Sequence, residues 1–263
     1  MPLDSTVTLL ENRRLGPAAF VATFRSEPLA RDTRPGQFVM IGFPTGSEPL
    51  LRRPYSVYRV GRPGSPRDTC EVQYKVVGQG TARLASLRAG EQISCLGPLG
   101  TGFLPPAPGA VPLLVAGGIG IAGLLQQAVH LTSLGLHARL LFGCRSAEDL
   151  PLAEGFEALG LPVEIATEDG SAGRRGLVTA LLEEHLDGSA AEVYACGPQP
   201  MLRAVARQAA GRAGCQVAVE SPMACGFGVC LGCVVETAKG EGFGRYVRAC
   251  VEGPVFRAEA LRW

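Results

Sequence analysis

Four cysteines close to the C-terminal end of the sequence are the feature that most restricts how the chain can fold. Cys225, Cys230 and Cys233 are separated by four and by two residues, and Cys250 follows after sixteen more. Three glycines lie between the first three cysteines, where the missing side chains let backbone N–H groups approach the sulfur atoms. Hydrophobic periodicity fades in this part of the chain. We therefore expect the segment to be organised by a bound cofactor.

The spacing of these cysteines favours a two-iron cluster over a zinc ion. It matches the plant-type ferredoxin pattern, in which one loop and one distant residue supply the thiolates. A zinc site with four cysteine ligands normally presents two close pairs, and here only Cys230 and Cys233 form such a pair. We predict a 2Fe-2S cluster held by Cys225, Cys230, Cys233 and Cys250. Zinc is the alternative, which iron analysis and a visible spectrum would test.

The other five cysteines lie mostly inside apolar, strand-like runs, where a free thiol behaves as a small buried hydrophobe. No apolar run follows Arg13 and Arg14, so we expect no secretory signal and a cytoplasmic location. Disulfides are rare in that reducing compartment. Of the five, only Cys196 has a sequence context that suggests a role beyond packing. The five are Cys70, Cys95, Cys144, Cys196 and Cys215.

Charge and hydropathy exclude two classes of partner. The sequence has 25 basic and 24 acidic side chains, a balance that gives no electrostatic footprint for nucleic acid or for an anionic membrane. Residues 110–125 lack polar side chains, but a membrane-spanning helix needs about 20 such residues. Four glycines interrupt this run, which favours a buried strand, a tight turn and the start of a helix.

The N-terminal part of the chain reads as a small antiparallel barrel. Between residues 6 and 99, short runs rich in Val, Ile, Phe and Tyr alternate with Gly and Pro. We assign residues 1–104 to this barrel domain. The predicted strands cover residues 20–24, 38–43, 55–60, 71–77 and 92–96.

After a proline-rich linker at residues 105–109, strands and helices alternate, which is the mark of a parallel sheet with crossover helices. We assign residues 109–215 to this α/β domain and residues 216–263 to the domain of the cysteine cluster. The predicted strands of the α/β domain cover residues 111–116, 138–144, 163–167 and 193–196.

A glycine-rich turn in the α/β domain suggests a dinucleotide site. Gly118-Ile119-Gly120 follows a predicted strand and opens a predicted helix, where glycine lets the backbone approach a pyrophosphate. The acidic residue that a Rossmann dehydrogenase carries roughly 20 positions further on is missing. Arg145 and Ser146 end the next strand instead, which indicates another type of dinucleotide fold.

Cys196 lies at the end of a predicted strand and is followed by Gly197 and Pro198. A residue at that place points into the crevice where open parallel sheets bind ligands. A buried free cysteine without a role is the alternative.

Three segments of the barrel carry residue types that suit a flavin dinucleotide. A guanidinium fork suits a diphosphate, an aromatic ring suits stacking on a flavin, and a glycine turn with threonine at a helix start suits phosphate oxygens. Each segment alone is an ordinary strand or turn. The segments are Arg53-Pro54-Tyr55-Ser56, Gln73-Tyr74-Lys75 and Gly78-Gln79-Gly80-Thr81.

Together and in this order, these motifs resemble those of the ferredoxin-reductase-type flavoproteins. The sequence specifically resembles the electron-transfer subunits of NAD-dependent, class 1B dihydroorotate dehydrogenases, over essentially its whole length. The segment from Glu220 to Cys233 is the most specific part of the likeness. Its other carriers are residues 35–38, 53–56, 78–81, 97–100, 117–120, 168–171, 196–198 and 253–256.

The resemblance implies a six-stranded antiparallel barrel that binds FAD, a central parallel-sheet domain that binds NAD, and a small C-terminal 2Fe-2S domain. By match of motif, Cys196 would lie near the nicotinamide. Position 55 is aliphatic in many relatives, so the stacking of Tyr55 on the flavin stays open. The FAD contacts implied are Arg53, Pro54, Tyr55, Ser56, Gln73, Tyr74, Lys75, Gly80 and Thr81, and Gly117, Gly118 and Gly120 would contact NAD.

The resemblance also implies the activity and the partner. A separate FMN-containing subunit would oxidise dihydroorotate, and electrons would pass through the 2Fe-2S cluster and FAD to NAD+, in a heterotetramer that serves pyrimidine biosynthesis. Related subunits serve sulfhydrogenases, sulfide dehydrogenases and ferredoxin-NADP oxidoreductases, and these are the alternative within the same class. A zinc-stabilised adaptor without redox chemistry is the alternative from another class. Arg145 could meet a 2'-phosphate or stack on an adenine, so NAD against NADP stays open.

Overall fold

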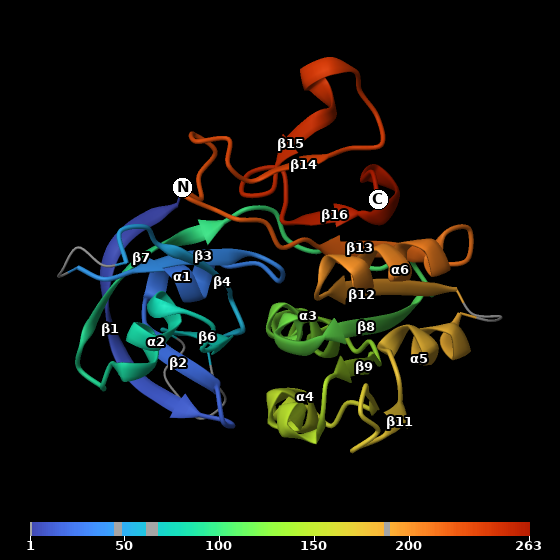
Figure 1. The fold of residues 1–263 in the computed structure, drawn as a ribbon, viewed down its shortest axis with the longest axis horizontal. Coiled ribbons are helices and arrows are strands. Elements are labelled where there is room, and N and C mark those ends of the chain that lie inside the picture. The colour runs from blue at the N-terminus through green and yellow to red at the C-terminus, as the bar shows by residue number, and fades with distance from the viewer. Residues whose placement is uncertain (1, 45–48, 62–67, 187–189) are drawn as a thin grey trace.

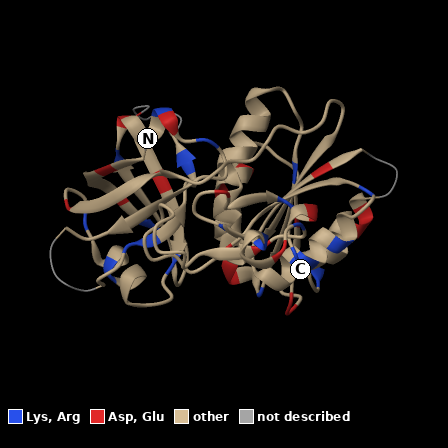
Figure 2. Ribbon diagram, turned by 90° about the horizontal axis from the view of Figure 1, so that it is seen from above, with Lys and Arg blue, Asp and Glu red and all other residues tan. Residues whose placement is uncertain are grey.

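In a computed structural model of the chain, the structure describes residues 2–44, 49–61, 68–186 and 190–263, and the fold is built around two large sheets (Figure 1). One sheet is formed by the N-terminal residues and the other by the central residues. The segment with the clustered cysteines lies above both in that view. Figure 2 shows acidic and basic residues interspersed over both halves, as expected from their near-equal numbers.

The N-terminal sheet is antiparallel throughout, which confirms the predicted barrel. On β1, Val7 and Leu9 point into the core while Thr6 and Thr8 are exposed, the alternation that a half-buried strand requires. Among the described residues this sheet has seven strands rather than six, because the two-residue β5 also pairs with β6. In sheet order they are β4 (Arg53–Ser56), β3 (Phe38–Gly42), β7 (Gln92–Leu99), β1 (Leu3–Arg14), β2 (Ala19–Arg25), β6 (Thr69–Lys75) and β5 (Arg59–Val60).

Two short helices accompany the barrel. Helix α1 (Glu27–Asp32) places Leu29 in the barrel core. Helix α2 (Gln79–Ser86) begins at Gly78 and places Leu84 in the same core. Its start lies next to β4, because the side chain of Arg53 packs on Gly80.

The central sheet is parallel except at one edge, which confirms the predicted α/β domain. On β8, Leu114 packs into the core cluster of one sheet face, and Leu113 and Val115 pack into that of the other. Both faces are therefore covered, which explains the unbroken apolar run. In sheet order the strands are β11 (Arg174–Arg175), β10 (Val163–Thr167), β9 (Arg139–Cys144), β8 (Val111–Gly117), β12 (Ala191–Cys196), β13 (Gly214–Ala218) and β16 (Val255–Arg257).

Helices cover the two faces of the central sheet. Helix α3, η2 and helix α4 contribute to one core cluster, and helices α5 and α6 contribute to the other. No helix among the residues that the structure describes is long and apolar enough to cross a membrane. The elements are η1 (Gly118–Gly123), α3 (Leu125–Ser133), η2 (Ala147–Ala153), α4 (Glu154–Glu157), α5 (Val178–His185) and α6 (Gln199–Ala209).

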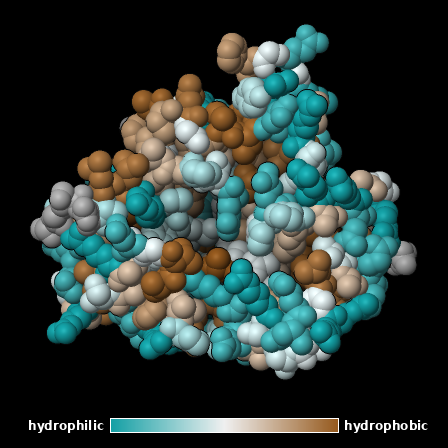
Figure 3. Space-filling model, in the orientation of Figure 1, coloured by the Kyte–Doolittle hydropathy of each residue, from teal (hydrophilic) through white to brown (hydrophobic). Residues whose placement is uncertain are grey.

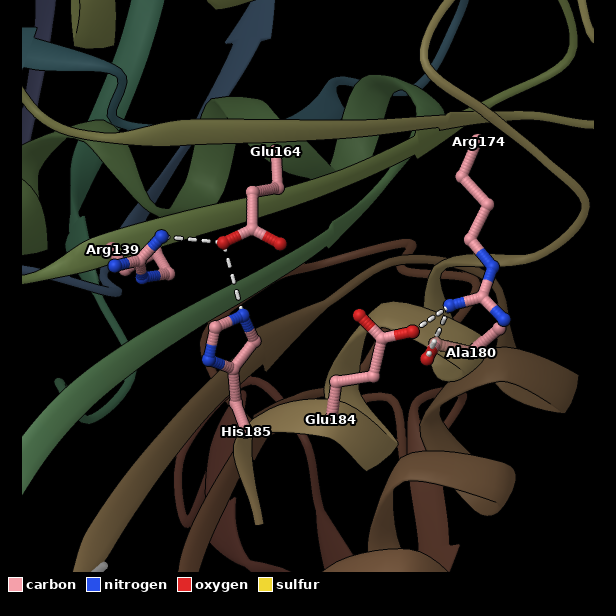
Figure 4. A network of polar contacts seen from close by, with 6 residues as sticks. All are labelled: Arg139, Glu164, Arg174, Ala180, Glu184 and His185. Carbon is pink, nitrogen blue, oxygen red and sulfur yellow. Dashed lines mark hydrogen bonds and ion pairs between the residues drawn. The ribbon is translucent and has the colours of Figure 1, made fainter. Parts of the chain in front are cut away.

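A polar network joins the amino ends of β9 and β10 to helix α5 (Figure 4). It lies opposite the end of the sheet where these strands have their carboxyl ends. Arg139 Nη1 donates to Glu164 Oε1 at 2.5 Å, and His185 Nε2 lies 2.9 Å from the same oxygen. Beside it, Arg174 pairs with Glu184. These contacts join two strands to helix α5 and give His185 a structural role.

The last part of the chain departs from the predicted boundary between residues 215 and 216. That boundary falls inside β13, and β16 pairs with β13, so residues 255–257 belong to the central sheet. Leu261 also packs in a core cluster of this sheet. The segment that leaves the sheet, residues 219–254, is called the cysteine module below. It contains the hairpin of β14 (Val234–Glu236) and β15 (Tyr246–Arg248), joined through η3 (Gly242–Arg245), and a last turn, η4 (Ala258–Ala260), follows β16.

Candidate functional site

The four clustered cysteines meet as two thiol pairs. The thiols of Cys225 and Cys230 lie within hydrogen-bonding distance of each other, and so do those of Cys233 and Cys250. The hairpin creates the second pair, because Ala249 N–H donates to Cys233 O at 2.8 Å and sets Cys250 beside Cys233. Cys233 and Cys250 are buried, whereas Cys230 is exposed. The module therefore has an inner and an outer pair of thiols.

Backbone N–H groups surround the outer pair. Burial raises the pKa of the Cys225 thiol, but hydrogen bonds from the backbone at Cys230, Phe227 and Val229 outweigh it and bring the value to about 6. Gly232 N–H also faces Cys230 Sγ at 3.4 Å. Donors placed in this way favour thiolate, which is the form that binds metal.

The loop can take this path only with particular backbone conformations. Gly226 has a φ of +80°, and a Cβ there would lie 2.5 Å from Met40 Cγ. Leu231 has a φ of +57°, a strained value for a leucine that persists only where the surroundings require it. Among the described residues, no three His, Cys, Asp or Glu side chains gather closely enough to hold a single metal ion. Two pairs of thiols suit a centre of two irons better, so these residues fit a 2Fe-2S cluster.

The inner pair of thiols packs directly on the barrel. Cys233 and Cys250 form one hydrophobic cluster with Phe38 and Met40 of β3 and with Leu99 of β7. Phe38 is buried in this cluster and also lines the large cavity described next. Phe38, Val219 and Met223 therefore take part in both the hydrophobic cluster and the cavity wall.

A cavity of about 470 Å³ lies where the barrel, the central sheet and the cysteine module meet. It gathers nearly all the predicted flavin contacts, namely Pro54, Tyr55, Ser56, Gln73, Tyr74, Lys75 and Thr81.

Two of the predicted flavin contacts, Arg53 and Gly80, do not line the cavity. Arg53 is exposed, and its Nη1 donates to Leu51 O at 2.5 Å. Its side chain crosses the start of helix α2, with Cγ 3.3 Å from the position of a Cβ on Gly80. Arg53 and Gly80 therefore contact each other beside the cavity.

The walls of the cavity suit a flavin dinucleotide. Tyr55 and Tyr74 stand edge to face with ring centroids 5.9 Å apart, and the Tyr74 hydroxyl donates to Asn12 Oδ1 at 2.9 Å. Gln73 Oε1 is buried and has no hydrogen-bond partner, so a ligand with a polar hydrogen would satisfy it. The first N–H groups of helix α2 lie beside Thr81, where phosphate oxygens would find donors.

The glycine-rich turn of the central sheet differs in part from the prediction. It forms η1, and the α-helix begins only at Leu125. A Cβ on Gly120 would lie 2.6 Å from Cys196 O, and one on Gly117 would lie 2.5 Å from the sulfur of Met201. Close packing against neighbouring segments thus requires these two glycines. Gly118 has a φ of +51° and open space beside it, and the assignment of all three to NAD stays a prediction.

Cys196 ends β12 and lines the cavity from the side of the central sheet. Burial raises the pKa of its thiol to about 12, so the group is a neutral thiol near pH 7. Its Sγ lies 3.0 Å from the position of a Cβ on Gly123, and Ser56 Oγ lies 3.4 Å from the same point. A buried thiol can contact a ligand here, and its raised pKa disfavours the thiolate form. Its predicted role beside the nicotinamide stays a prediction.

Two charged groups of the site were missed from the sequence. Glu220 lines the cavity just after β13; the residue is exposed overall, but the protein around its carboxyl group desolvates it and raises its pKa. The sequence signal that could have indicated Glu220 was a carboxylate just after a predicted strand, next to the cysteine segment.

Asp149 is the second charged group that was missed. Lys75 was predicted as a flavin contact, but its partner was not: Lys75 Nζ donates to Asp149 Oδ1 at 2.5 Å. No sequence pattern links residues 74 positions apart in this way.

Comparisons with known families match two parts of the chain. Residues 220–262 match the family described as the iron-sulfur cluster binding domain of dihydroorotate dehydrogenase B. Residues 114–207 match the oxidoreductase NAD-binding domain.

Several relatives match almost the whole chain and are named dihydroorotate dehydrogenase B (NAD(+)), electron transfer subunit; two of them serve as examples. The protein of Caldanaerobacter subterraneus subsp. tengcongensis is 38% identical over 255 residues, covering 96% of each chain. The protein of Enterococcus faecalis is 37% identical over 260 residues, covering 97% of each chain.

Solved structures show the same fold. The NADH-dependent reduced ferredoxin-NADP oxidoreductase has a chain with a TM-score of 0.84 and 27% identity, covering 98% of this chain and 90% of that chain. A cytochrome P450 reductase of Amycolatopsis has a TM-score of 0.65 and 26% identity, covering 80% of this chain and 66% of that chain.

Proposed function

The chain belongs to the family of dihydroorotate dehydrogenase B (NAD(+)) electron transfer subunits, and from this premise we propose that it passes electrons from a dihydroorotate-oxidising subunit to NAD+ in pyrimidine biosynthesis. It is an NAD-dependent oxidoreductase subunit. Its cofactors are FAD, a 2Fe-2S cluster and NAD.

The observation that carries the proposal is the order of the sites. The inner thiols Cys233 and Cys250 share one hydrophobic cluster with Phe38, and Phe38 lines the proposed flavin cavity. Cys196 lines the same cavity from the ligand-binding edge of the parallel sheet. Cluster ligands, flavin cavity and dinucleotide edge thus follow one another without an intervening domain.

The chain contributes placement to the chemistry. When bound, FAD supplies the exchange between single electrons of the cluster and the hydride of the nicotinamide. The aromatic walls of Tyr55 and Tyr74 and the unpaired Gln73 Oε1 would orient the flavin, and Cys225, Cys230, Cys233 and Cys250 would hold the cluster. Hydride transfer between flavin and nicotinamide is cofactor chemistry and needs no acid-base pair from the chain, and burial keeps the Cys196 thiol protonated.

The surface around the outer thiols suits a protein partner. Phe227, Val229 and Leu231 are 52%, 72% and 61% exposed, although they are large apolar side chains. Figure 3 shows apolar surface gathered at the upper left, over the part of the cysteine module that Figure 1 draws beside the barrel. Exposed apolar patches of this kind mark interaction sites. We call these three side chains the cluster-loop face and propose that the FMN-containing catalytic subunit docks on it.

The assembly follows from the same premise. The names of the relatives imply a catalytic subunit beside the electron transfer subunit. We propose a heterotetramer in the cytoplasm, with two such chains on a catalytic dimer, and this rests on the resemblance of the sequence.

The function is tested by anaerobic co-expression with the candidate FMN subunit and by visible spectra during reduction. Addition of NADH or, separately, of dihydroorotate should bleach both the flavin and the cluster bands. Bleaching by NADH alone would support the assigned cofactors but refute dihydroorotate as the electron source. The partner would then be sought among the related sulfide or ferredoxin enzymes.

The docking face is tested with charge substitutions. Val229→Glu and Phe227→Glu should each abolish copurification with the catalytic subunit, because a carboxylate would be buried at the interface. Leu134→Glu is the matched control, since Leu134 is 53% exposed at the end of helix α3, outside the cysteine module. Each variant must keep its cluster absorption. If both variants still copurified with the catalytic subunit, the proposed docking face would be refuted. Loss of copurification in Leu134→Glu as well would indicate a general folding defect.

A further inference from the structure

Two side chains of β6 reach from the barrel to the central domain. Lys75 Nζ donates to Asp149 Oδ1 at 2.5 Å, and Gln73 Nε2 donates to Leu152 O at 3.0 Å. Lys75 and Gln73 are alternate residues of one strand, so they point to the same side. Both line the flavin cavity, and both contacts end on η2.

The same η2 lies at the dinucleotide edge of the central sheet. It begins at Ala147, three residues after Cys144, which ends β9. Ala147 N–H donates to Ser171 Oγ at 2.8 Å, and the Ser171 hydroxyl donates to Asp169 Oδ1 at 2.6 Å. η2 is therefore tied to the loop that follows β10. The carboxyl ends of parallel strands are where open α/β sheets bind dinucleotides.

A second ion pair joins the same two parts of the molecule and serves as a comparison. Arg13 of β1 pairs with Glu154, the first residue of helix α4. The side chains of Arg13 and Glu154 are 32% and 38% exposed, against 26% and 16% for Lys75 and Asp149. Arg13 and Glu154 do not line the flavin cavity. The more buried pair is the one that borders the flavin cavity, and water screens it less.

We propose that Asp149, held by Lys75, is a positioning residue that sets the dinucleotide edge against the flavin cavity. The pair fixes η2, and η2 fixes the segment around Arg145 and the loop of Asp169 and Ser171. Loss of the pair should therefore weaken NAD(H) binding more than it slows flavin reduction. Because Lys75 also lines the flavin cavity, bound FAD should hold the same pair in place and strengthen NAD+ binding, and by linkage NAD+ should then strengthen the retention of FAD by the same factor. The inference deepens the proposed function and rests on it.

The test uses the assembled holoenzyme with Asp149→Ala. The KM for NADH should rise about fivefold or more, within the usual range of coupling between sites, while kcat stays within about twofold. Asp149→Glu should restore most of the affinity, since it keeps the carboxylate. Glu154→Ala is the matched control, because it removes the acidic partner of Arg13 from a second ion pair between the barrel and the central domain. Its KM should stay within about twofold of the wild-type value.

A second readout does not depend on turnover. The release of FAD on heating is followed by flavin fluorescence, with and without saturating NAD+. NAD+ should delay the release in the wild type and in Glu154→Ala, and the delay should shrink in Asp149→Ala. Equal KM increases in both variants, or an unchanged delay in Asp149→Ala, would overturn the inference. Failure of NADH to bleach the wild-type flavin would instead overturn the proposed function.

Discussion

The cysteine module and the central sheet differ in what holds them together. The central sheet buries apolar side chains on both faces, with Leu114 in one core cluster and Val115 in the other. The module contributes only a few buried residues, two of which are the thiols Cys233 and Cys250. Its large apolar side chains at positions 227, 229 and 231 face outward instead. A segment with so little core is expected to take its order from the bound cluster, and its exposed apolar side chains form the proposed docking face.

The largest effect should follow the loss of a cluster ligand. Cys250→Ser should abolish the visible absorption of the cluster and expose residues 219–254 to proteolysis, because metal binding contributes directly to folding of such segments. FAD should remain bound, though less tightly, since the barrel supplies the largest share of the cavity wall and all the predicted flavin contacts, while the module supplies a smaller share. Visible spectra, FAD content and limited proteolysis measure the three outcomes.

Cys215→Ser is the matched control for that prediction. Cys215 is buried in β13 and packs in a core cluster away from the four thiols. Its substitution should lower the free energy of unfolding by roughly 1–3 kcal/mol and leave the cluster in place. If Cys250→Ser kept a normal cluster spectrum, the ligand assignment would be wrong.

A cavity in the central sheet should give the next largest effect. Leu114 is fully buried, and Leu114→Ala should lower the free energy of unfolding by about 2–5 kcal/mol through lost burial and the remaining cavity. Denaturant unfolding followed by circular dichroism measures the loss, and the native variant should keep its cluster spectrum. A cost below about 1 kcal/mol would contradict the view that this domain depends on its core.

The smallest effect concerns the polar network at the amino ends of the strands (Figure 4). Burial alone would raise the pKa of Glu164, but the hydrogen bonds from His185 and Arg139 outweigh it and lower the pKa below 4.5. A lowered folded-state pKa contributes stability above the unfolded value, and this is lost as pH falls through the folded value. Glu164→Gln should therefore reduce stability by less than about 1 kcal/mol at pH 7, with a smaller difference below pH 4. Thermal unfolding at both pH values checks the sign, and a constant difference would contradict it.

Much of the site could be predicted because its signals are local in sequence. The spacing of Cys225, Cys230 and Cys233 reflects one loop, and the glycines around them reflect backbone that must lie close to sulfur. The apolar run at residues 110–125 correctly indicated a strand and a turn, because β8 is buried on both faces. The predicted flavin contacts on β4 and β6 were proposed from motifs in a fixed order, and the structure brings most of them to one cavity.

The remaining features depend on long-range packing. The pair of Lys75 and Asp149 joins residues from different domains, and each is an ordinary surface type when taken alone. β16 has only three residues, too few for a periodic signal, and it is a strand because β13 offers it an edge. Gly120 was assigned to phosphate binding from its motif, whereas the contact with Cys196 shows a steric need that no local pattern could reveal.

The way in which the cysteine module is attached to the central sheet determines which substitutions in the module the sheet can tolerate. The module leaves the sheet after Ala218 and returns at Val255, and these two residues are paired neighbours on adjacent strands. Entry and exit therefore lie side by side, so the module is a closed insertion at one sheet edge. Residues in the exposed loop between the cysteines can therefore be substituted while Ala218 and Val255 stay paired and the module keeps its backbone contacts with the rest of the chain.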